Sequence, residues 1–221
     1  MIHLLPPYGW TGVKMTKTLL IMRHGKSSWK DKSLPDIKRP LKKRGEEDSE
    51  VIGKILKHKK LLPNVILTSP AKRARQTAEI VAKEAGIPKR VKLVDTLYMA
   101  EVQDIFNVLR DLEGNPNRVM IVGHNPGLEA VLQMLNGCAE SLPTGAMAHL
   151  RLAVDDWKTL SIDTTGEMAD FWNPESEGFE KNADLKDDKK KDKKNDKKDD
   201  KKSDKKANKK DDKKDDKKDK K

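Results

Sequence analysis

Short apolar runs recur along the chain, and each is followed by a longer stretch with helical periodicity. The apolar runs lie at residues 18–22, 65–67, 91–94 and 118–122. Runs this short and this apolar are typical of strands buried on both faces of a parallel sheet. Two later segments, residues 149–154 and 160–163, are expected to form a final antiparallel pair.

The intervening stretches predict four helices. They are expected at residues 42–60, 71–85, 101–112 and 127–135. In the first, Val51, Ile52, Ile55 and Leu56 form one apolar stripe among charged residues. Strands that alternate with helices predict an α/β domain, with helices on both faces of a mostly parallel mixed sheet. The expected fold is therefore a three-layer α/β/α sandwich.

Three of the predicted strands end in unusual polar sequences. These are Arg23-His24-Gly25, Thr68-Ser69-Pro70 leading to Arg73, and Gly123-His124-Asn125. Ligands of open α/β sheets bind beyond the carboxyl ends of the strands. We therefore expect these three strand ends to converge on one site.

The net charge of +11 suggests a nucleic-acid partner until its distribution is considered. Residues 186–221 contain 20 Lys and 12 Asp and carry +8 of that charge. A repeat of this kind, almost free of apolar residues, predicts a disordered tail. The tail lacks arginine and aromatic residues, so specific nucleic-acid binding is not expected. The predicted organisation is an N-terminal extension at 1–15, an α/β domain at 16–179 and the tail at 180–221.

The remaining bulk features suggest a location in the cytoplasm. A single cysteine, Cys138, excludes an intrachain disulfide and a multi-cysteine metal site. No stretch approaches the ~18 apolar residues that a membrane span requires. The N-terminal residues lack the basic region of a secretory signal. Translation from Met1 or from Met15 is equally compatible with the first predicted strand, and the oligomeric state is left open.

The Arg23-His24-Gly25 tripeptide has the composition of a phosphate-transfer site. An imidazole accepts a phosphoryl group when one ring nitrogen is unprotonated and the other is held by a hydrogen bond. The guanidinium of Arg23 offers a fork of donors suited to phosphate oxygens. Gly25 removes a side chain where the backbone would approach a ligand. The alternative is a chance Arg-His pair at a strand end.

Arg73 and His124 extend the same pattern at the other two strand ends. Arg73 stands in the first turn of a helix, where free N–H groups and the dipole attract anions. Arg75 points elsewhere, so we choose Arg73, although both could lie on a solvated face. A lone histidine is more often structural than catalytic, but His124 matches His24 in its position after a strand.

Four separated motifs together resemble the histidine phosphatase superfamily, and more narrowly its SixA-type phosphohistidine phosphatase branch. The motifs are LLIMRHGKSSW with the later Arg39-Pro40-Leu41, TSPAKRARQTA, LYMAEVQDIFNVL and IVGHNPGLE. The resemblance implies a phosphoglycerate mutase-like fold. It also implies that His24 is the nucleophile, that Arg23, Arg73 and His124 complete the phosphate-binding set, and that no metal or cofactor is needed.

Other residues near these motifs are weaker candidates. Glu101 could be a general acid, although it also suits the first turn of a helix. Ser28 could donate to phosphate, and Gly25 would line the same site. Arg39 could guard the pocket rim or be exposed to solvent.

Three functions remain open from the sequence. The first is hydrolysis of phosphohistidine on a protein through a covalent intermediate on His24, because an imidazole leaving group needs less help from an acid. The second is a small-molecule phosphomonoesterase acting on a phosphate ester. The third is a non-catalytic phosphate-binding or scaffold domain in which the charged tail is the functional part.

Overall fold

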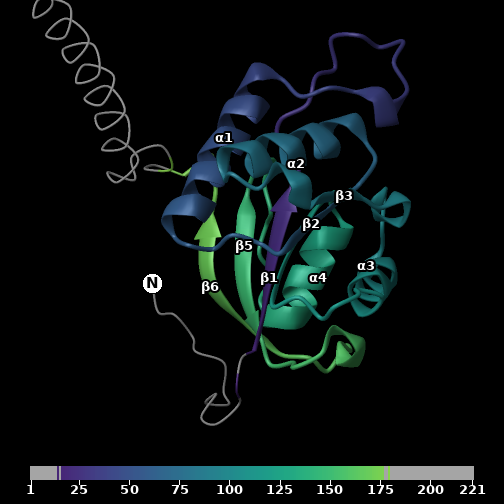
Figure 1. Ribbon diagram of the computed structural model, residues 1–221. Coiled ribbons are helices and arrows are strands. Elements are labelled where there is room, and N and C mark those ends of the chain that lie inside the picture. The colour runs from purple at the N-terminus through teal and green to yellow at the C-terminus, as the bar shows by residue number, and fades with distance from the viewer. Residues whose placement is uncertain (1–13, 15, 177–178, 180–221) are drawn as a thin grey trace, which may run out of the picture. The chain divides into compact units, whose positions relative to one another are not determined.

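The computed structural model of the chain describes residues 14, 16–176 and 179 (Figure 1). The chain divides into two units, residues 1–180 and 181–221. The predicted tail, residues 180–221, lies outside the described residues, as does the N-terminal extension except Lys14. No helix in the described part of the chain is both long and apolar enough to cross a membrane.

Six strands form one mixed sheet, as the alternating pattern predicts. They are β1 (Lys17–Arg23), β2 (Val65–Thr68), β3 (Val91–Leu93), β4 (Arg118–Gly123), β5 (Met147–Leu152) and β6 (Gly166–Trp172). Their order is β3-β2-β4-β1-β5-β6. The first four are parallel, whereas β5 and β6 pair antiparallel at one side.

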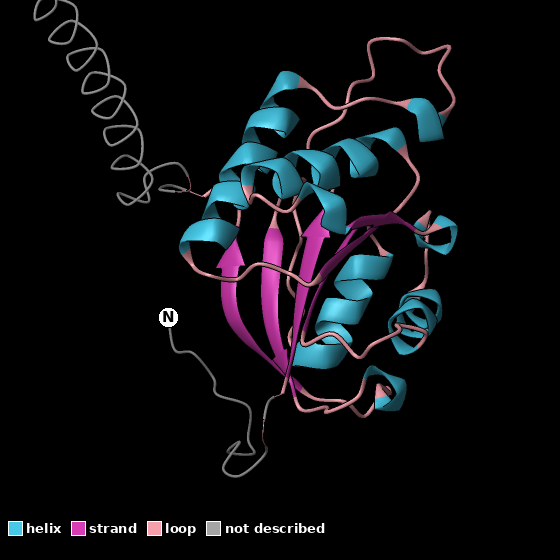
Figure 2. Cartoon of the chain, in the orientation of Figure 1, coloured by secondary structure: helices cyan, strands magenta, loops and turns pink. Residues whose placement is uncertain are grey.

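Four helices cover the two faces of the sheet (Figures 1 and 2). They are α1 (Lys43–His58), α2 (Lys72–Glu84), α3 (Val102–Arg110) and α4 (Gly127–Asn136). Alternate side chains of β1 point to opposite faces, as the pleat of a strand requires. Leu20 and Met22 pack in the core under α1 and α2, whereas Leu19 and Ile21 pack in the core under α3 and α4. The three-layer α/β/α fold is confirmed.

Two details of the predicted strands are wrong. Residues 160–163 form no strand, and the last strand instead spans Gly166–Trp172. The third strand was expected to be buried, but Lys92 and Leu93 are exposed because β3 is an edge strand. Neither error affects the strand ends that carry the candidate site.

Candidate active site

The parallel strands β1, β4 and β2 end at the same level of the sheet. Arg23 of β1 lies opposite Gly123 of β4, so the next residues, His24 and His124, leave adjacent strands together. Ser69 follows β2 at this level, because β2 pairs with β4 in register up to its last residue. The expected convergence of the three strand ends is therefore present in the structure.

His24 is buried, and its hydrogen bonds fix which ring nitrogen carries the proton. Its Nδ1 lies 2.8 Å from the carbonyl oxygen of Gly25, which can only accept, so Nδ1 is the donor. The lone pair is then on Nε2, which accepts from Nε of Arg73 at 3.2 Å. Burial is the main cause that lowers the pKa of His24 to about 3, while the bond to Gly25 opposes this shift and the charge of Arg73 adds to it. At neutral pH the ring is uncharged and Nε2 is nucleophilic.

His124 is also buried, and its ring lies 5.1 Å from that of His24 between centroids. Its Nδ1 lies 3.3 Å from Nη2 of Arg73, which can only donate, so Nδ1 holds the lone pair. Its Nε2 then donates to Oγ of Ser69 at 2.9 Å. Burial and then the charge of Arg73 lower the pKa of His124 to about 4, against the opposing effect of Asp36. Both histidines are therefore neutral in the free protein.

Arg73 lies in the first turn of α2 and is only 5% exposed. Its Nε and Nη2 donate to His24 and His124. Its Nη1 and Nη2 also donate to the backbone oxygen and to Oδ2 of Asp36, at 2.8 and 2.9 Å. Arg75, two residues later, is exposed. The choice of Arg73 over Arg75 thus agrees with where the two side chains lie.

Arg23 stands at the end of β1, beside both histidines. Its Nη1 donates to the carbonyl oxygen of Leu142 at 3.0 Å. Its charge helps to lower the pKa of His24 and of His124, which places it within electrostatic reach of both. Its Nε is buried and makes no hydrogen bond within the described part of the protein. This N–H is a donor that an oxyanion can use.

Asp36 enters the site from the loop after His24, and the sequence analysis did not select it. Its Oδ1 lies 2.6 Å from Nη1 of Arg39, and its Oδ2 accepts from Arg73 and from the hydroxyl of Tyr98 at 3.0 Å. Burial tends to raise the pKa of Asp36, but hydrogen bonds from Arg39, Arg73 and Tyr98 outweigh it and lower the pKa below its usual range. Asp36 is therefore a carboxylate at neutral pH.

Arg39 is buried, so the expectation that it is exposed to solvent is wrong, whereas its role at the pocket rim stays a prediction. It is 6% exposed and is bound within the loop. Its Nε donates to the carbonyl oxygen of Ser28 and its Nη2 to Oγ of Ser27, while its guanidinium stacks on Trp29. Oγ of Ser28 accepts from the backbone of Lys30 at 3.2 Å, which is a contact within the loop. Arg39 thus organises the segment that carries Asp36.

The structure gives a packing reason for a glycine at position 25. A Cβ at this position would lie 2.6 Å from the carbonyl oxygen of Gly45, in the first turn of α1. The missing side chain therefore admits the start of α1, and the approach of a ligand to the Gly25 backbone stays a prediction. The N–H of Gly25 donates to Oγ1 of Thr77, whose hydroxyl donates to the carbonyl oxygen of Arg73.

Glu101 is the N-cap residue of α3 and is exposed. Its backbone N–H donates to Oδ2 of Asp104, at 2.9 Å, within a capping box. This arrangement satisfies backbone donors at the helix start. The contact favours the structural alternative for Glu101 over the general acid.

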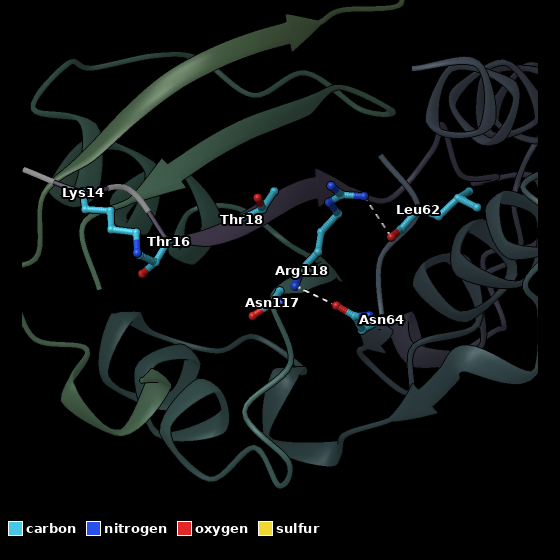
Figure 3. Close-up of a pocket in the computed structure, with 7 residues that line it drawn as sticks. All are labelled: Lys14, Thr16, Thr18, Leu62, Asn64, Asn117 and Arg118. Carbon is cyan, nitrogen blue, oxygen red and sulfur yellow. Dashed lines mark hydrogen bonds between the residues drawn. The ribbon is translucent and has the colours of Figure 1, made fainter. Parts of the chain in front are cut away.

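A separate cavity of about 560 Å³ lies near the opposite ends of the strands (Figure 3). Arg118 at the start of β4 lines it, but this guanidinium donates to the carbonyl oxygens of Lys60 and Leu62. The cavity contains no histidine among its lining residues. No cluster of three or more His, Cys, Asp or Glu side chains suited to a metal ion occurs among the described residues. The histidine-containing strand ends therefore remain the candidate site.

The first half of the domain matches a known protein family. Residues 19–97 match the model described as the histidine phosphatase superfamily, branch 1. This segment includes His24, Arg73 and Asp36. The match supports a phosphatase.

Individual relatives extend the match beyond that segment. An uncharacterized chloroplastic protein of Arabidopsis thaliana is 30% identical over 153 residues, covering 65% of this chain and 70% of the relative. A Mycobacterium tuberculosis protein is 30% identical over 143 residues, covering 60% of this chain and 87% of the relative. A crystal structure from Agrobacterium tumefaciens, described as phosphohistidine phosphatase SixA, is 25% identical with a TM-score of 0.60. The match covers 72% of this chain and 99% of the Agrobacterium tumefaciens chain.

Proposed function

The chain belongs to the histidine phosphatase superfamily, in its SixA-type branch, and we propose that it hydrolyses phosphohistidine on a protein through a phosphorylated His24. The observation that carries this proposal is the neutral, buried His24. Its unprotonated Nε2 lies 3.2 Å from the guanidinium of Arg73. A nucleophile and an oxyanion donor are thus side by side.

Arg73, Arg23 and His124 supply the environment for a phosphoryl group. The Nε and Nη2 donors of Arg73 face the two histidines. An incoming phosphate takes over these donors, which frees the lone pair of His24. The transferring phosphoryl group spreads charge over three oxygens, and two guanidiniums stabilise that charge without reorganisation.

The first step transfers phosphorus between two nitrogens. The lone pair of His24 Nε2 forms a bond to phosphorus, and the bond from phosphorus to the substrate imidazole breaks. The leaving nitrogen keeps the electron pair. His24 becomes an imidazolium whose Nδ1–H still donates to the Gly25 carbonyl, as it does in the free protein.

The second step hydrolyses the phosphorylated enzyme. A water oxygen bonds to phosphorus while the bond from phosphorus to Nε2 breaks, which returns neutral His24. The water proton passes to the lone pair on Nδ1 of His124. Ser69 holds the opposite nitrogen of this ring through a 2.9 Å hydrogen bond. His124 then returns the proton to the released phosphate.

The need of the leaving group for a proton favours phosphohistidine over a phosphate ester as the substrate. An alkoxide needs a proton from the enzyme, but the carboxyl groups of Asp36 and Glu101 are poorly suited. Asp36 has a lowered pKa, and Glu101 caps a helix. A substrate imidazole is itself protonated near neutral pH on its other nitrogen, and then it leaves as a neutral ring.

The test compares a phosphohistidine peptide with an alkyl phosphate ester at equal concentrations, measured by phosphate release. We expect faster turnover of the peptide, little change for Glu101→Gln, and the same rates with EDTA. His24→Ala should abolish both activities and the acid-labile phosphate on the protein.

Three outcomes distinguish the alternatives. Preference for the ester together with dependence on Glu101 indicates a small-molecule phosphomonoesterase. Retained turnover in His24→Ala contradicts the covalent mechanism. Phosphate binding by wild-type protein without any turnover supports the scaffold alternative.

A further inference from the structure

The guanidinium of Arg73 presents two hydrogen-bonding edges with different partners. The inner edge, formed by Nε and Nη2, faces His24 and His124 at 3.2 and 3.3 Å. The outer edge, formed by Nη1 and Nη2, meets Asp36 at both its backbone oxygen and its carboxylate. A planar guanidinium cannot turn about one edge without moving the other.

Asp36 is itself fixed from two further directions. The buried Arg39 holds its Oδ1 at 2.6 Å, and the hydroxyl of Tyr98 donates to its Oδ2 at 3.0 Å. The ring of Tyr98 also packs edge-on against that of His124, with centroids 5.7 Å apart. The carboxylate is thus held between the loop, the pocket arginine and a residue that contacts the second histidine.

We propose that Asp36 is a positioning residue that holds the outer edge of Arg73, so that the inner edge faces the transferring phosphoryl group. This inference rests on the proposed function, because it assigns Arg73 to the phosphoryl oxygens. Asp36 acts on the reaction only through Arg73. Its outer-edge contacts do not compete with a phosphate bound at the inner edge.

Removal of the carboxylate has two effects of opposite sign. The negative charge of Asp36 opposes an incoming phosphate, so its loss strengthens ground-state attraction. The same loss releases Arg73, which then solvates the transition state less well. A collapsed loop weakens phosphate binding and lowers kcat together, whereas in a misdirected Arg73 the lost repulsion from Asp36 offsets the weaker ground-state contact and only kcat falls. The two roles therefore predict different kinetic signatures.

The experiment compares Asp36→Asn with wild type on the phosphohistidine peptide. An amide has one acceptor oxygen where the carboxylate has two, so it cannot serve Arg39 and Arg73 together. We expect kcat to fall about 10- to 100-fold, the scale of a small misplacement at a reacting centre. The inhibition constant of inorganic phosphate should stay equal or decrease.

Asp31→Asn is the matched control. Asp31 lies in the same loop, is exposed, and accepts hydrogen bonds from Ser33. We expect wild-type kcat from this variant. Tyr98→Phe removes one donor to Asp36 but keeps the ion pair with Arg73, so we expect a smaller loss of kcat in the same direction.

Two results overturn the assignment. One is a kcat of Asp36→Asn within about twofold of wild type, since positioning losses are larger. The other is a kcat loss matched by equally weakened phosphate binding.

The ¹⁵N resonance of His24 Nε2 gives a readout that needs no turnover. Asp36→Asn should shift it, because the hydrogen bond from Arg73 changes, and Asp31→Asn should not. An unshifted resonance overturns the role of Asp36 even if the substrate class is correct. A shifted resonance in a protein inactive on phosphohistidine supports that role and rejects the proposed substrate.

Discussion

At the scale of single residues, the site depends on two imidazoles kept uncharged by burial. A protonated ring has no lone pair for phosphorus, and two buried cations beside two guanidiniums would repel each other. The structure avoids both problems, since His24 and His124 have pKa values of about 3 and about 4. The guanidiniums then provide the positive charge, and the imidazoles provide the electron pairs.

The same depressed pKa values predict a loss of stability in acid. The unfolded histidines titrate near their usual pKa of 6.5, so below that pH the unfolded chain binds more protons than the native one. The free energy of unfolding therefore falls as the pH decreases from about 6.5 through the folded pKa values. At about pH 4.5, each buried histidine lowers the free energy of unfolding by about 2 to 3 kcal/mol relative to its value at neutral pH.

Replacement of one histidine tests this relation. We expect His24→Asn to show a smaller drop in Tm than wild type when the pH changes from about 7 to about 4.5. The reference is wild type, measured at the same two pH values. Identical pH dependence of Tm in the two proteins would show that His24 is protonated in the native state.

Part of this site could be predicted from the amino-acid sequence alone. His24 and His124 could be paired from the sequence because each follows an apolar run, and register then places them together. Asp36 could not be separated from Asp31, since both are lone acids in a lysine-rich loop. Only the folded loop directs the carboxylate of Asp36 to Arg73 and leaves that of Asp31 bound to Ser33. Local sequence carries no signal for that difference.

At the scale of elements, the close approach of α1 to the end of β1 holds the Asp36 loop, residues 26–42. A Cβ on Gly45 would lie 2.4 Å from the carbonyl oxygen of Lys26, and one on Gly25 would lie 2.6 Å from that of Gly45. The backbone N–H of Lys42 also donates to the carbonyl oxygen of Lys26, at 2.8 Å. Both ends of the loop that carries Asp36 are therefore anchored at one backbone contact.

A methyl group at this contact should disturb catalysis as well as stability. We expect Gly45→Ala to destabilise the protein by about 1 to 3 kcal/mol, the usual cost of overpacking, and to lower kcat by displacing the loop. Gly53→Ala is the matched control on the same helix. Its Cβ would lie 2.6 Å from Cβ of Glu84 and 2.8 Å from the carbonyl oxygen of Val81, both in α2 and away from the Asp36 loop.

Thermal unfolding and steady-state kinetics of the two variants separate the effects. Both should lose stability, but only Gly45→Ala should lose turnover at a temperature where each is folded. Equal kcat in the two variants would contradict a role for the α1 contact in holding the loop.

The elements themselves were largely predictable. All four helices end within two residues of their predicted ends, because apolar stripes and terminating glycines or prolines define them locally. The last strand was misplaced because Gly166–Trp172 lies at the sheet edge, where its middle residues are only half-buried. Partial burial removes the apolar run that reveals an inner strand. Its position depends on pairing with β5, which is a long-range contact.

At the scale of the whole molecule, charge and chemistry lie in different parts of the sequence. Residues 186–221 carry +8 of the net charge of +11, so residues 1–185 carry +3. The four proposed catalytic residues and Asp36 all belong to the unit formed by residues 1–180. High net charge affects association and solubility rather than a bond-breaking step.

Deletion of residues 186–221 should therefore leave turnover of a small phosphorylated substrate nearly unchanged. In the proposed mechanism, side chains from the ends of β1 and β4 and from the start of α2 bind and attack the phosphoryl group, and the deletion removes none of them. The tail alternates its charges every few residues, so its field weakens beyond a Debye length of about 8 to 10 Å.

Measurement of kcat/KM for full-length and truncated protein, at low and high salt, checks this expectation. A large loss in the truncated protein at both salt concentrations would mean that the tail takes part in catalysis, whereas a loss confined to low salt would assign it to electrostatic attraction of substrate.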